Sequence, residues 1–319
     1  MILTILILTA MIFDILLIVC GVAMVLGGAD RLTEGAAALA RRMHVPEIII
    51  GLTIVAAGTS APELFVSLVS ALKGTPDMAM GNVIGSNTMN CMLIVGCAAM
   101  VAPMSISRNT VHKDIPFSVG ASVLLIILGI DAFLGRFDGI LLLLGFAAFM
   151  YYTLSQAKKN KVEETETVKK QNSWLSAFYV VIGLTLLVVG SNIFVDAASR
   201  VAYALGLSEG VVGLTIVAGG TSLPELATSV VAARKGQSAI AIGNVIGSNV
   251  FNILLILGLT ATICPMEIRG ITIVDLMMML GSVSLVWLFS RTRYTVERWE
   301  GALLVGGFLV YLAWLLSNV

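Results

Sequence analysis

The feature that most constrains this chain is a short apolar segment that occurs twice and carries a glutamate each time. Residues 51–64 read GLTIVAAGTSAPEL, and residues 213–226 read GLTIVAGGTSLPEL. In each copy an apolar helix is interrupted at Gly-Thr-Ser-x-Pro, because the proline has no N–H and its ring clashes with the preceding turn. Glu63 and Glu225 follow directly after the interruptions. A carboxylate in a segment that is otherwise apolar enough for lipid indicates a functional site.

The interruption should expose backbone oxygens next to each carboxylate. We expect the first half-helix to end near Gly58, which leaves the carbonyls of Val55, Ala56 and Ala57 without partners inside the helix. Unwound backbone at membrane depth is tolerated where it lines a cavity or binds a ligand. Half-helix ends that coordinate cations recur in secondary transporters. The repeated break therefore predicts a cation site.

A capping box is the alternative explanation of the same residues. Ser60 is the expected N-cap of the second half-helix and Glu63 lies at its N3 position, and Ser222 and Glu225 have the same spacing. In a soluble protein this pattern would be explained equally well by capping. Its duplication in membrane-like segments favours the cation site.

The composition places the chain in a membrane. Of its 319 residues 58% are hydrophobic and 12% are charged, whereas soluble domains carry about 25% charged residues. Apolar runs of about 20 residues predict an all-α polytopic protein with ten spans. The expected centres are Leu17, Ala56, Asn90, Leu125, Leu144, Leu184, Ala218, Asn252, Leu285 and Val310. The net charge of zero gives no indication of a nucleic-acid partner. The four cysteines lie in or beside apolar runs, without metal-ligand spacing, and are interpreted as core residues.

The chain is an internal duplication. Residues 51–90 and 213–252 match at 26 of 40 positions without a gap, at an offset of 162. Each copy holds five spans, an odd number, so the second copy must enter the membrane from the opposite side. We therefore predict two inverted-topology repeats: a first five-helix repeat at 1–157, a linker at 158–172 and a second repeat at 173–319.

The basic residues agree with this arrangement. One set of loops holds 15 of the 19 Lys and Arg residues. The positive-inside rule places these loops in the cytoplasm. Both termini are then outside, the polar linker 158–172 lies in the cytoplasm, and the expected location is the cytoplasmic membrane. The apolar N-terminus, with no Lys or Arg before Arg31, is interpreted as the start of the first span rather than a cleaved signal.

A second repeated motif supplies polar side chains. Residues 81–90 read GNVIGSNTMN, and residues 243–252 read GNVIGSNVFN. Residues four apart share a helix face, so each copy forms a polar stripe. Four asparagines in these motifs are interpreted as residues that hydrogen-bond to neighbouring helices: Asn82, Asn87, Asn244 and Asn249. Four other residues are favoured as ligands: Ser86, Asn90, Ser248 and Asn252.

Such a site offers carboxylate, hydroxyl, amide and carbonyl oxygens. Hard cations such as Ca²⁺ and Na⁺ prefer these ligands, whereas zinc and copper favour thiolate or imidazole. The two histidines, His44 and His112, fall in expected loop regions. Zinc and copper are therefore disfavoured.

At these motifs the sequence resembles the calcium/cation antiporter superfamily, and in its compact form the prokaryotic sodium/calcium exchangers. The resemblance covers essentially the whole chain. It implies ten helices, with the second, third, seventh and eighth forming the ion-binding core and the first and sixth sliding against it. It also implies a ligand set: the carboxylates of Glu63 and Glu225, the hydroxyl and carbonyl oxygens of Thr59, Ser60, Thr221 and Ser222, the carbonyls of Ala56 and Ala218, and Ser86, Asn90, Ser248 and Asn252. Many sodium/calcium exchangers have an aspartate where this chain has Asn252.

The expected function is an antiporter that exchanges Na⁺ for Ca²⁺ and exports Ca²⁺, with the lipid bilayer as its surroundings, no cofactor and no obligate protein partner. The nearest alternative is a Ca²⁺/H⁺ antiporter that uses the same glutamates. A passive cation channel is less consistent with broken helices in inverted repeats. An intramembrane hydrolase with Ser60 or Ser222 as nucleophile lacks a base and a G-x-S-x-G elbow.

Overall fold

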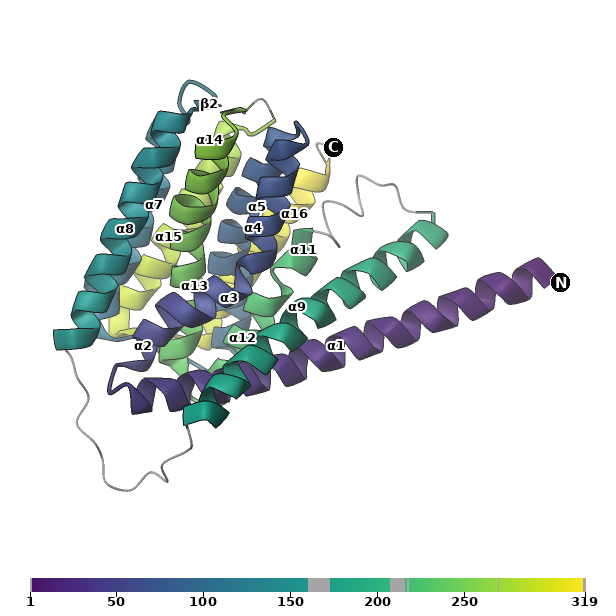
Figure 1. Cartoon of the computed structure of the whole chain (residues 1–319), viewed down its shortest axis with the longest axis horizontal. Helices are drawn as coiled ribbons and strands as arrows, with labels where there is room; N and C mark the ends of the chain where they lie inside the picture. Colours follow the sequence, from purple (N-terminus) through teal and green to yellow (C-terminus); the bar gives the residue numbers. More distant parts are fainter. Residues whose placement is uncertain (1, 160–172, 207–215, 217, 269, 318–319) are drawn as a thin grey trace.

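The computed structural model describes residues 2–159, 173–206, 216, 218–268 and 270–317. This part of the chain is helical apart from short two-residue strands (Figure 1). Several helices contain π-helical turns, labelled η. The elements are α1 (Ile2–Arg42), α2 (Glu47–Ile50), η1 (Gly51–Val55), α3 (Ala56–Thr59), α4 (Ala61–Leu72), α5 (Pro76–Met89), η2 (Asn90–Ile94), α6 (Val95–Val101), β1 (Met104–Ser105), η3 (Thr110–Asp114), α7 (Ile115–Leu128), β2 (Phe133–Leu134), α8 (Arg136–Lys159), α9 (Ser173–Ala204), α11 (Ala218–Thr221), α12 (Leu223–Arg234), α13 (Ser238–Val250), η5 (Phe251–Leu257), α14 (Gly258–Ile263), β3 (Met266–Glu267), α15 (Ile273–Arg293), β4 (Thr295–Val296) and α16 (Arg298–Ser317).

The membrane class agrees with the prediction. In the described part, eight helices are long and apolar enough to cross a membrane. A further span is formed if the pair Glu47–Thr59 and Ala61–Leu72, bent by 46°, counts as one broken helix. The remaining predicted span, centred near Ala218, includes residues 207–215 and 217, which lie outside the described residues. Most of the predicted linker, residues 160–172, also lies outside them.

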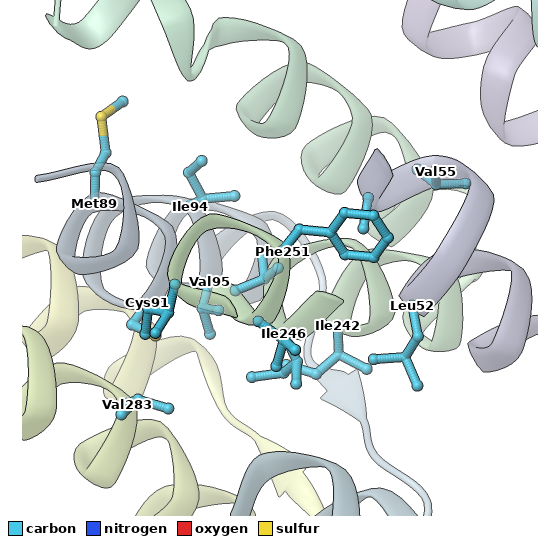
Figure 2. Packing of buried hydrophobic residues seen from close by; sticks show 14 of the residues in the cluster. Leu52, Val55, Met89, Cys91, Ile94, Val95, Ile242, Ile246, Phe251 and Val283 are labelled. Carbon is cyan, nitrogen blue, oxygen red and sulfur yellow. The ribbon is translucent and has the colours of Figure 1, made fainter. Parts of the chain in front are cut away.

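Two helices that each contain a π-helical segment form the centre of the bundle: α5–η2–α6 and α13–η5–α14. In the apolar windows of Ser238–Ile263 and Pro76–Val101, 94% and 78% of the residues are buried, against 17–39% in the other six single-helix spans. Figure 2 shows part of the core that they share with η1 and α15, with the side chains of Leu52, Ile94, Ile246 and Val283 among those packed there. Because neighbouring helices shield these two helices, their polar side chains are kept away from lipid.

The long helices α1 and α9 form a pair of their own (Figure 1). They meet at glycines that are seven residues apart in each helix. A Cβ atom on Gly28 would lie 2.8 Å from the carbonyl oxygen of Gly183, and one on Gly21 would lie 2.8 Å from that of Gly190. The backbones approach so closely because these positions carry no side chain.

Equivalent residues of the two halves exchange equivalent contacts. β1 pairs with β4 and β2 with β3, and β3 and β4 are the copies of β1 and β2 at the offset of 162. The contacts of Gly96 with Gly301 and of Gly139 with Gly258 are related by the same offset. The described part of the chain is thus packed reciprocally around its duplication.

One ion pair ties the α1–α9 pair to the central bundle. Lys235, just after α12, has its Nζ 2.7 Å from Asp30 Oδ1 on α1. It also donates to the carbonyl oxygen of Asp30 at 2.9 Å and to Thr33 Oγ1 at 3.1 Å. Gly236 then turns the chain with φ of +75°, a conformation that glycine adopts without strain.

Candidate ion-binding site

The two predicted helix breaks are present and equivalent. Ser60 separates α3 from α4, and Ser222 separates α11 from α12. Each second half-helix has its proline in the first turn, where a missing N–H costs no helical hydrogen bond. Glu63 and Glu225 follow in those first turns, and each is 1% exposed. Two carboxylates are therefore buried inside an apolar bundle.

The capping-box interpretation is wrong in this structure. Neither Ser60 nor Ser222 makes a side-chain capping hydrogen bond to its own helix. Instead, Ser60 Oγ donates to Glu225 Oε1 at 3.1 Å, and Ser222 Oγ donates to Glu63 Oε1 at 3.3 Å. Each serine thus binds the glutamate of the other break, because the two breaks face one another in the bundle.

The first half-helix ends at Thr59, near the predicted end at Gly58. The Ala56 carbonyl accepts from the Ser60 N–H at 3.0 Å, and Thr59 Oγ1 lies 3.4 Å from it. The expectation that this carbonyl has no partner within the break is therefore wrong. Ala218 begins α11 at the equivalent position, and the surroundings of its side chain lie outside the described part of the structure.

Two asparagines hold the backbone at the carboxylates. Asn82 Nδ2 donates to the carbonyl oxygen of Glu63 at 3.2 Å and to Ser67 Oγ at 2.9 Å. Asn244 Nδ2 makes the equivalent bonds to the Glu225 carbonyl at 3.3 Å and to Ser229 Oγ at 3.0 Å. These bonds join helices, which is the role that the sequence predicted for both asparagines.

A second set of asparagines crosses between the halves. Asn90 Nδ2 donates to Asn249 Oδ1 at 3.0 Å, and Asn252 Nδ2 donates to Asn87 Oδ1 at 3.0 Å. Asn249 Nδ2 in turn lies 2.9 Å from Cys91 Sγ. The amide nitrogens of Asn90 and Asn252 are thus engaged, which turns both amide oxygens away from these partners.

Asn87 and Asn249 thus join helices, as the sequence predicted, whereas their role in orienting Asn90 and Asn252 was not predicted. The signal was present in the spacing Asn-x-x-Asn, because residues three apart share a helix face. Sequence analysis also missed Ser191 on α9, whose hydroxyl donates to the carbonyl oxygen of Gly220 in the second break. No motif singles out Ser191, since hydroxyls are common in membrane helices.

The hydroxyl groups complete the connection between the four core segments. Ser222 Oγ lies 3.2 Å from Ser86 Oγ, and Ser248 Oγ lies 3.5 Å from Glu225 Oε1. Thr59 Oγ1 donates to Asn244 Oδ1 at 3.0 Å. Thr221 ends α11, directly before Ser222. The structure therefore links both breaks and both Gly-Ser-Asn segments, at residues 85–87 and 247–249, in one polar centre.

Four buried oxygens in this centre have no hydrogen-bond partner among the described residues: Glu63 Oε2, Glu225 Oε2, Asn90 Oδ1 and Asn252 Oδ1. Each of the four side chains is 1% exposed. No Lys, Arg or His of the described chain forms an ion pair with either glutamate. Buried polar atoms are normally satisfied, and buried carboxylates are paired or bind cations. The set of donors, all oxygen, fits a hard cation.

The local helix geometry also changes at Asn90 and Asn252. η2 begins at Asn90, and Asn252 is the second residue of η5. Single π-helical turns within α-helices occur frequently at functional sites. η2 begins about one turn after Ser86, and η5 begins about one turn after Ser248. Each π-helical segment therefore follows the polar centre directly.

The chain is similar to known proteins along nearly its whole length. It matches the family described as Sodium/calcium exchanger protein over residues 13–155 and again over residues 175–317. The second match begins and ends 162 residues after the first, which is the offset of the internal duplication.

Individual relatives cover the same range. The inner membrane protein YrbG of Escherichia coli strain K12 is 36% identical over 310 residues, which is 94% of this chain and 95% of that protein. The sodium/calcium exchanger MaX1 of Methanosarcina acetivorans is 30% identical over 340 residues, covering 94% and 97%. A structure of the sodium-calcium exchanger NCX_Mj soaked with Na⁺ and Sr²⁺ superimposes with a TM-score of 0.84 at 31% identity, covering 95% of this chain and 98% of that chain. This chain belongs to the sodium/calcium exchanger family.

Proposed function

We propose that the protein is a secondary antiporter that exchanges Na⁺ for Ca²⁺ across the cytoplasmic membrane and exports Ca²⁺. The observation that carries the proposal is the crossed pair of contacts between Ser60 and Glu225 and between Ser222 and Glu63. Each carboxylate keeps a second, buried oxygen without a partner. A cation bound between these oxygens would contact both breaks at once.

We propose the following residues as ligands around this centre. The charged ligands are Glu63 and Glu225. The neutral oxygens come from Thr59, Ser60, Ser86, Asn90, Thr221, Ser222, Ser248 and Asn252, with the carbonyls of Ala56 and Ala218. The Ala56 carbonyl keeps one of its two lone pairs for this role, because the single hydroxyl proton of Thr59 is donated to Asn244 Oδ1 at the shorter distance.

The charge of the centre makes exchange the natural outcome. Two carboxylates are neutralised by one Ca²⁺ or by two Na⁺, and both ions would compete for the same oxygens. An uncompensated charge is costly to move through an apolar bundle. The empty site therefore crosses poorly, whereas the Ca²⁺-loaded and Na⁺-loaded sites cross well.

The energy needed to export Ca²⁺ favours a third Na⁺ per cycle, although that ion leaves the centre with one uncompensated positive charge during the crossing. A tenfold Na⁺ gradient supplies about 1.4 kcal/mol per ion, so two ions supply about 2.8 kcal/mol. A third ion supplies about another 1.4 kcal/mol from its gradient. It also carries one net charge across the membrane, which adds about 2.3 kcal/mol at 100 mV, so the total drive is about 6.5 kcal/mol. Only the larger drive holds cytoplasmic Ca²⁺ thousands of times below the outside concentration.

The proposed architecture for alternating access is ten helices in two inverted repeats, 1–157 and 173–319, joined by the linker 158–172. The reciprocal strand and glycine contacts support it, because a two-fold related pair of halves exchanges equivalent contacts. We further propose that the α1–α9 pair slides against the core, with the basic loops in the cytoplasm and both termini outside.

The test is a flux measurement on purified protein in sealed proteoliposomes. Ca²⁺ uptake is followed with an outward Na⁺ gradient alone and with a pH gradient alone. Uptake that depends on the Na⁺ gradient supports the proposal. Uptake driven only by the pH gradient would establish the Ca²⁺/H⁺ alternative, and Ca²⁺ flux without any counter-ion gradient would establish a channel.

A further inference from the structure

A cavity of about 430 Å³ lies apart from the central site, between α2, η3, α8 and α13. None of the proposed transport ligands lines it. The cavity lies near the end of the bundle that carries Arg41, Lys113 and Lys158. The residues that line it are Pro46, Glu47, Ile48, Ile49, Ser107, Asn109, Thr110, Asp114, Tyr152, Thr153, Gln156, Ala239 and Ile242.

The wall of this cavity holds a buried carboxylate. Asp114 is the last residue of η3 and is 4% exposed. The Thr110 hydroxyl contacts it, and Lys113 is its charged neighbour in the chain. The Lys113 residue is exposed, and its Nζ lies over the Tyr152 ring at 6.0 Å from the centroid. The Lys113 charge that could compensate Asp114 is therefore screened by solvent, whereas the buried Asp114 carboxylate is not. An ionisable residue inside a membrane span marks a functional site by default.

A second observation points to a ligand in the same place. Thr153 is 1% exposed, lines the cavity from α8, and its Oγ1 has no hydrogen-bond partner among the described residues. Leaving a buried hydroxyl unsatisfied is costly, and a bound ion or its water would satisfy it.

A second carboxylate lines the cavity from α2. Glu47 begins α2, its side chain is 30% exposed, and it forms a long ion pair with Arg41 at 3.7 Å. Together with the hydroxyl and amide side chains of the lining, the cavity presents oxygen donors and two carboxylates. A Ca²⁺ ion takes six to eight oxygen ligands of this kind in flexible geometry. The volume leaves room for the water molecules that complete such a shell.

We propose that this cavity is a second binding site for a hard divalent cation, Ca²⁺ in class, with Asp114, Thr153 and Glu47 among its ligands. This goes beyond the proposed transport function, because the cavity is separate from the transport site. α2 leads through η1 and α3 to Ser60, and α13 leads to Ser248. A cation that joins α2 to η3 and α8 therefore restrains a segment that carries transport ligands, which makes the site regulatory.

The test measures Ca²⁺ binding to the purified full-length chain by equilibrium dialysis with radioactive Ca²⁺. The starting protein is the double variant Glu63→Gln, Glu225→Gln, in which the proposed transport site is silenced. We expect it to retain one bound Ca²⁺ per chain. Adding Asp114→Asn should weaken that binding at least roughly tenfold, and adding Thr153→Val should weaken it severalfold, since ligand and supporting groups each matter on this scale. Adding Asp196→Asn, on the exposed face of α9, should leave it unchanged.

The outcomes separate this proposal from the transport proposal. If the double variant binds no Ca²⁺, or binds it equally well with Asp114→Asn and with Thr153→Val, the cavity is not a cation site. If the double variant still binds two Ca²⁺ and only one depends on Asp114, the cavity site stands and the assignment of Glu63 and Glu225 fails. Thr153→Val differs from the native residue by one hydroxyl, so it tests the site even if Asp114→Asn folds poorly.

Discussion

Ser60 donates a hydrogen bond to Glu225 across the duplication, with 3.1 Å between Ser60 Oγ and Glu225 Oε1. Ser222 makes the equivalent bond to Glu63 at 3.3 Å. Each break therefore supplies a donor to the carboxylate of the other. A cation bound at either contact would change the hydrogen bonds of both breaks. Ion binding would therefore be coupled to the relative position of the two halves.

The first prediction concerns the two carboxylates. Glu63→Gln and Glu225→Gln keep the shape of the side chain but remove its charge. Each should reduce Na⁺-dependent Ca²⁺ uptake by at least about tenfold, because losing a charged, buried ligand costs on the order of 1.4 kcal/mol or more. The measurement is initial uptake in Na⁺-loaded proteoliposomes.

Glu300→Gln is the matched control for these variants. Glu300 is also buried, at 3% exposed, but its carboxylate accepts from the Glu297 N–H at the start of α16, away from the centre. Its uptake should match the wild type. A folded Glu63→Gln or Glu225→Gln protein with wild-type uptake would remove that glutamate from the transport site.

The sequence predicted the parts of this site that depend on composition and repetition. The two breaks follow from Pro62 and Pro224, whose missing N–H groups act locally whatever surrounds them. The duplication identified equivalent residues, and the apolar runs identified the membrane class. The helix-joining role of Asn82 and Asn244 followed from amides placed on a buried helix face.

What could not be predicted depends on which groups face each other in space. Ser60 has the same local pattern in a capping box and in this bundle, and only the position of Glu225 decides between them. The orientation of Asn252 depends on Asn87, which lies 165 residues away along the chain.

The second prediction concerns Asn252. Its Nδ2 donates to Asn87 and its Oδ1 has no partner, so the amide is held with its oxygen available. Asn252→Leu removes that oxygen and should raise the Ca²⁺ concentration needed for half-maximal uptake severalfold. Asn252→Asp keeps an oxygen and should retain exchange, with a pH dependence added to that of the wild type, measured from about pH 6 to 9.

Asn82→Leu serves as the comparison for Asn252→Leu. Asn82 donates to the backbone carbonyl of Glu63 and to the hydroxyl of Ser67, and it has no proposed ligand role. Its loss should lower thermal stability with a smaller effect on the half-maximal Ca²⁺ concentration. Full Ca²⁺ affinity in a folded Asn252→Leu protein would show that Asn252 only joins helices.

The third prediction tests the close contact of α1 and α9. In Gly28→Ala the new Cβ would lie 2.8 Å from both the Gly183 carbonyl oxygen and the Leu187 N, which are backbone atoms that cannot turn aside. The helices must separate, and overpacking of this kind costs about 1–3 kcal/mol. We expect a lower thermal transition and slower exchange.

Gly27→Ala is the neighbouring control. A Cβ on Gly27 meets nothing within 4 Å in the described structure. Because alanine favours a helix over glycine by about 1 kcal/mol, this variant should be equally or more stable. Equal stability losses in Gly27→Ala and Gly28→Ala would mean that the crossing does not depend on close backbone contact.

The last prediction concerns the ion pair between Asp30 and Lys235, which ties α1 to the end of α12 at 2.7 Å. The offset of 162 places Asn192 at the position equivalent to Asp30 and Lys73 at the position equivalent to Lys235. The equivalent pair therefore keeps the lysine, Lys73 of the first half, but has an amide, Asn192 of the second half, in place of the carboxylate. Asp30→Asn makes the halves alike, and it should loosen α1 in the state described here by no more than about 1 kcal/mol, because the pair is partly exposed. Amide hydrogen exchange along α1 around Asp30 should rise accordingly. Lys235→Gln also loses the bonds to the Asp30 carbonyl and to Thr33, so it should produce at least as large a rise. The double variant should add nothing to Lys235→Gln, and Lys73→Gln should have no effect. Independent, additive effects of Asp30→Asn and Lys235→Gln would show that the two residues do not act as a pair.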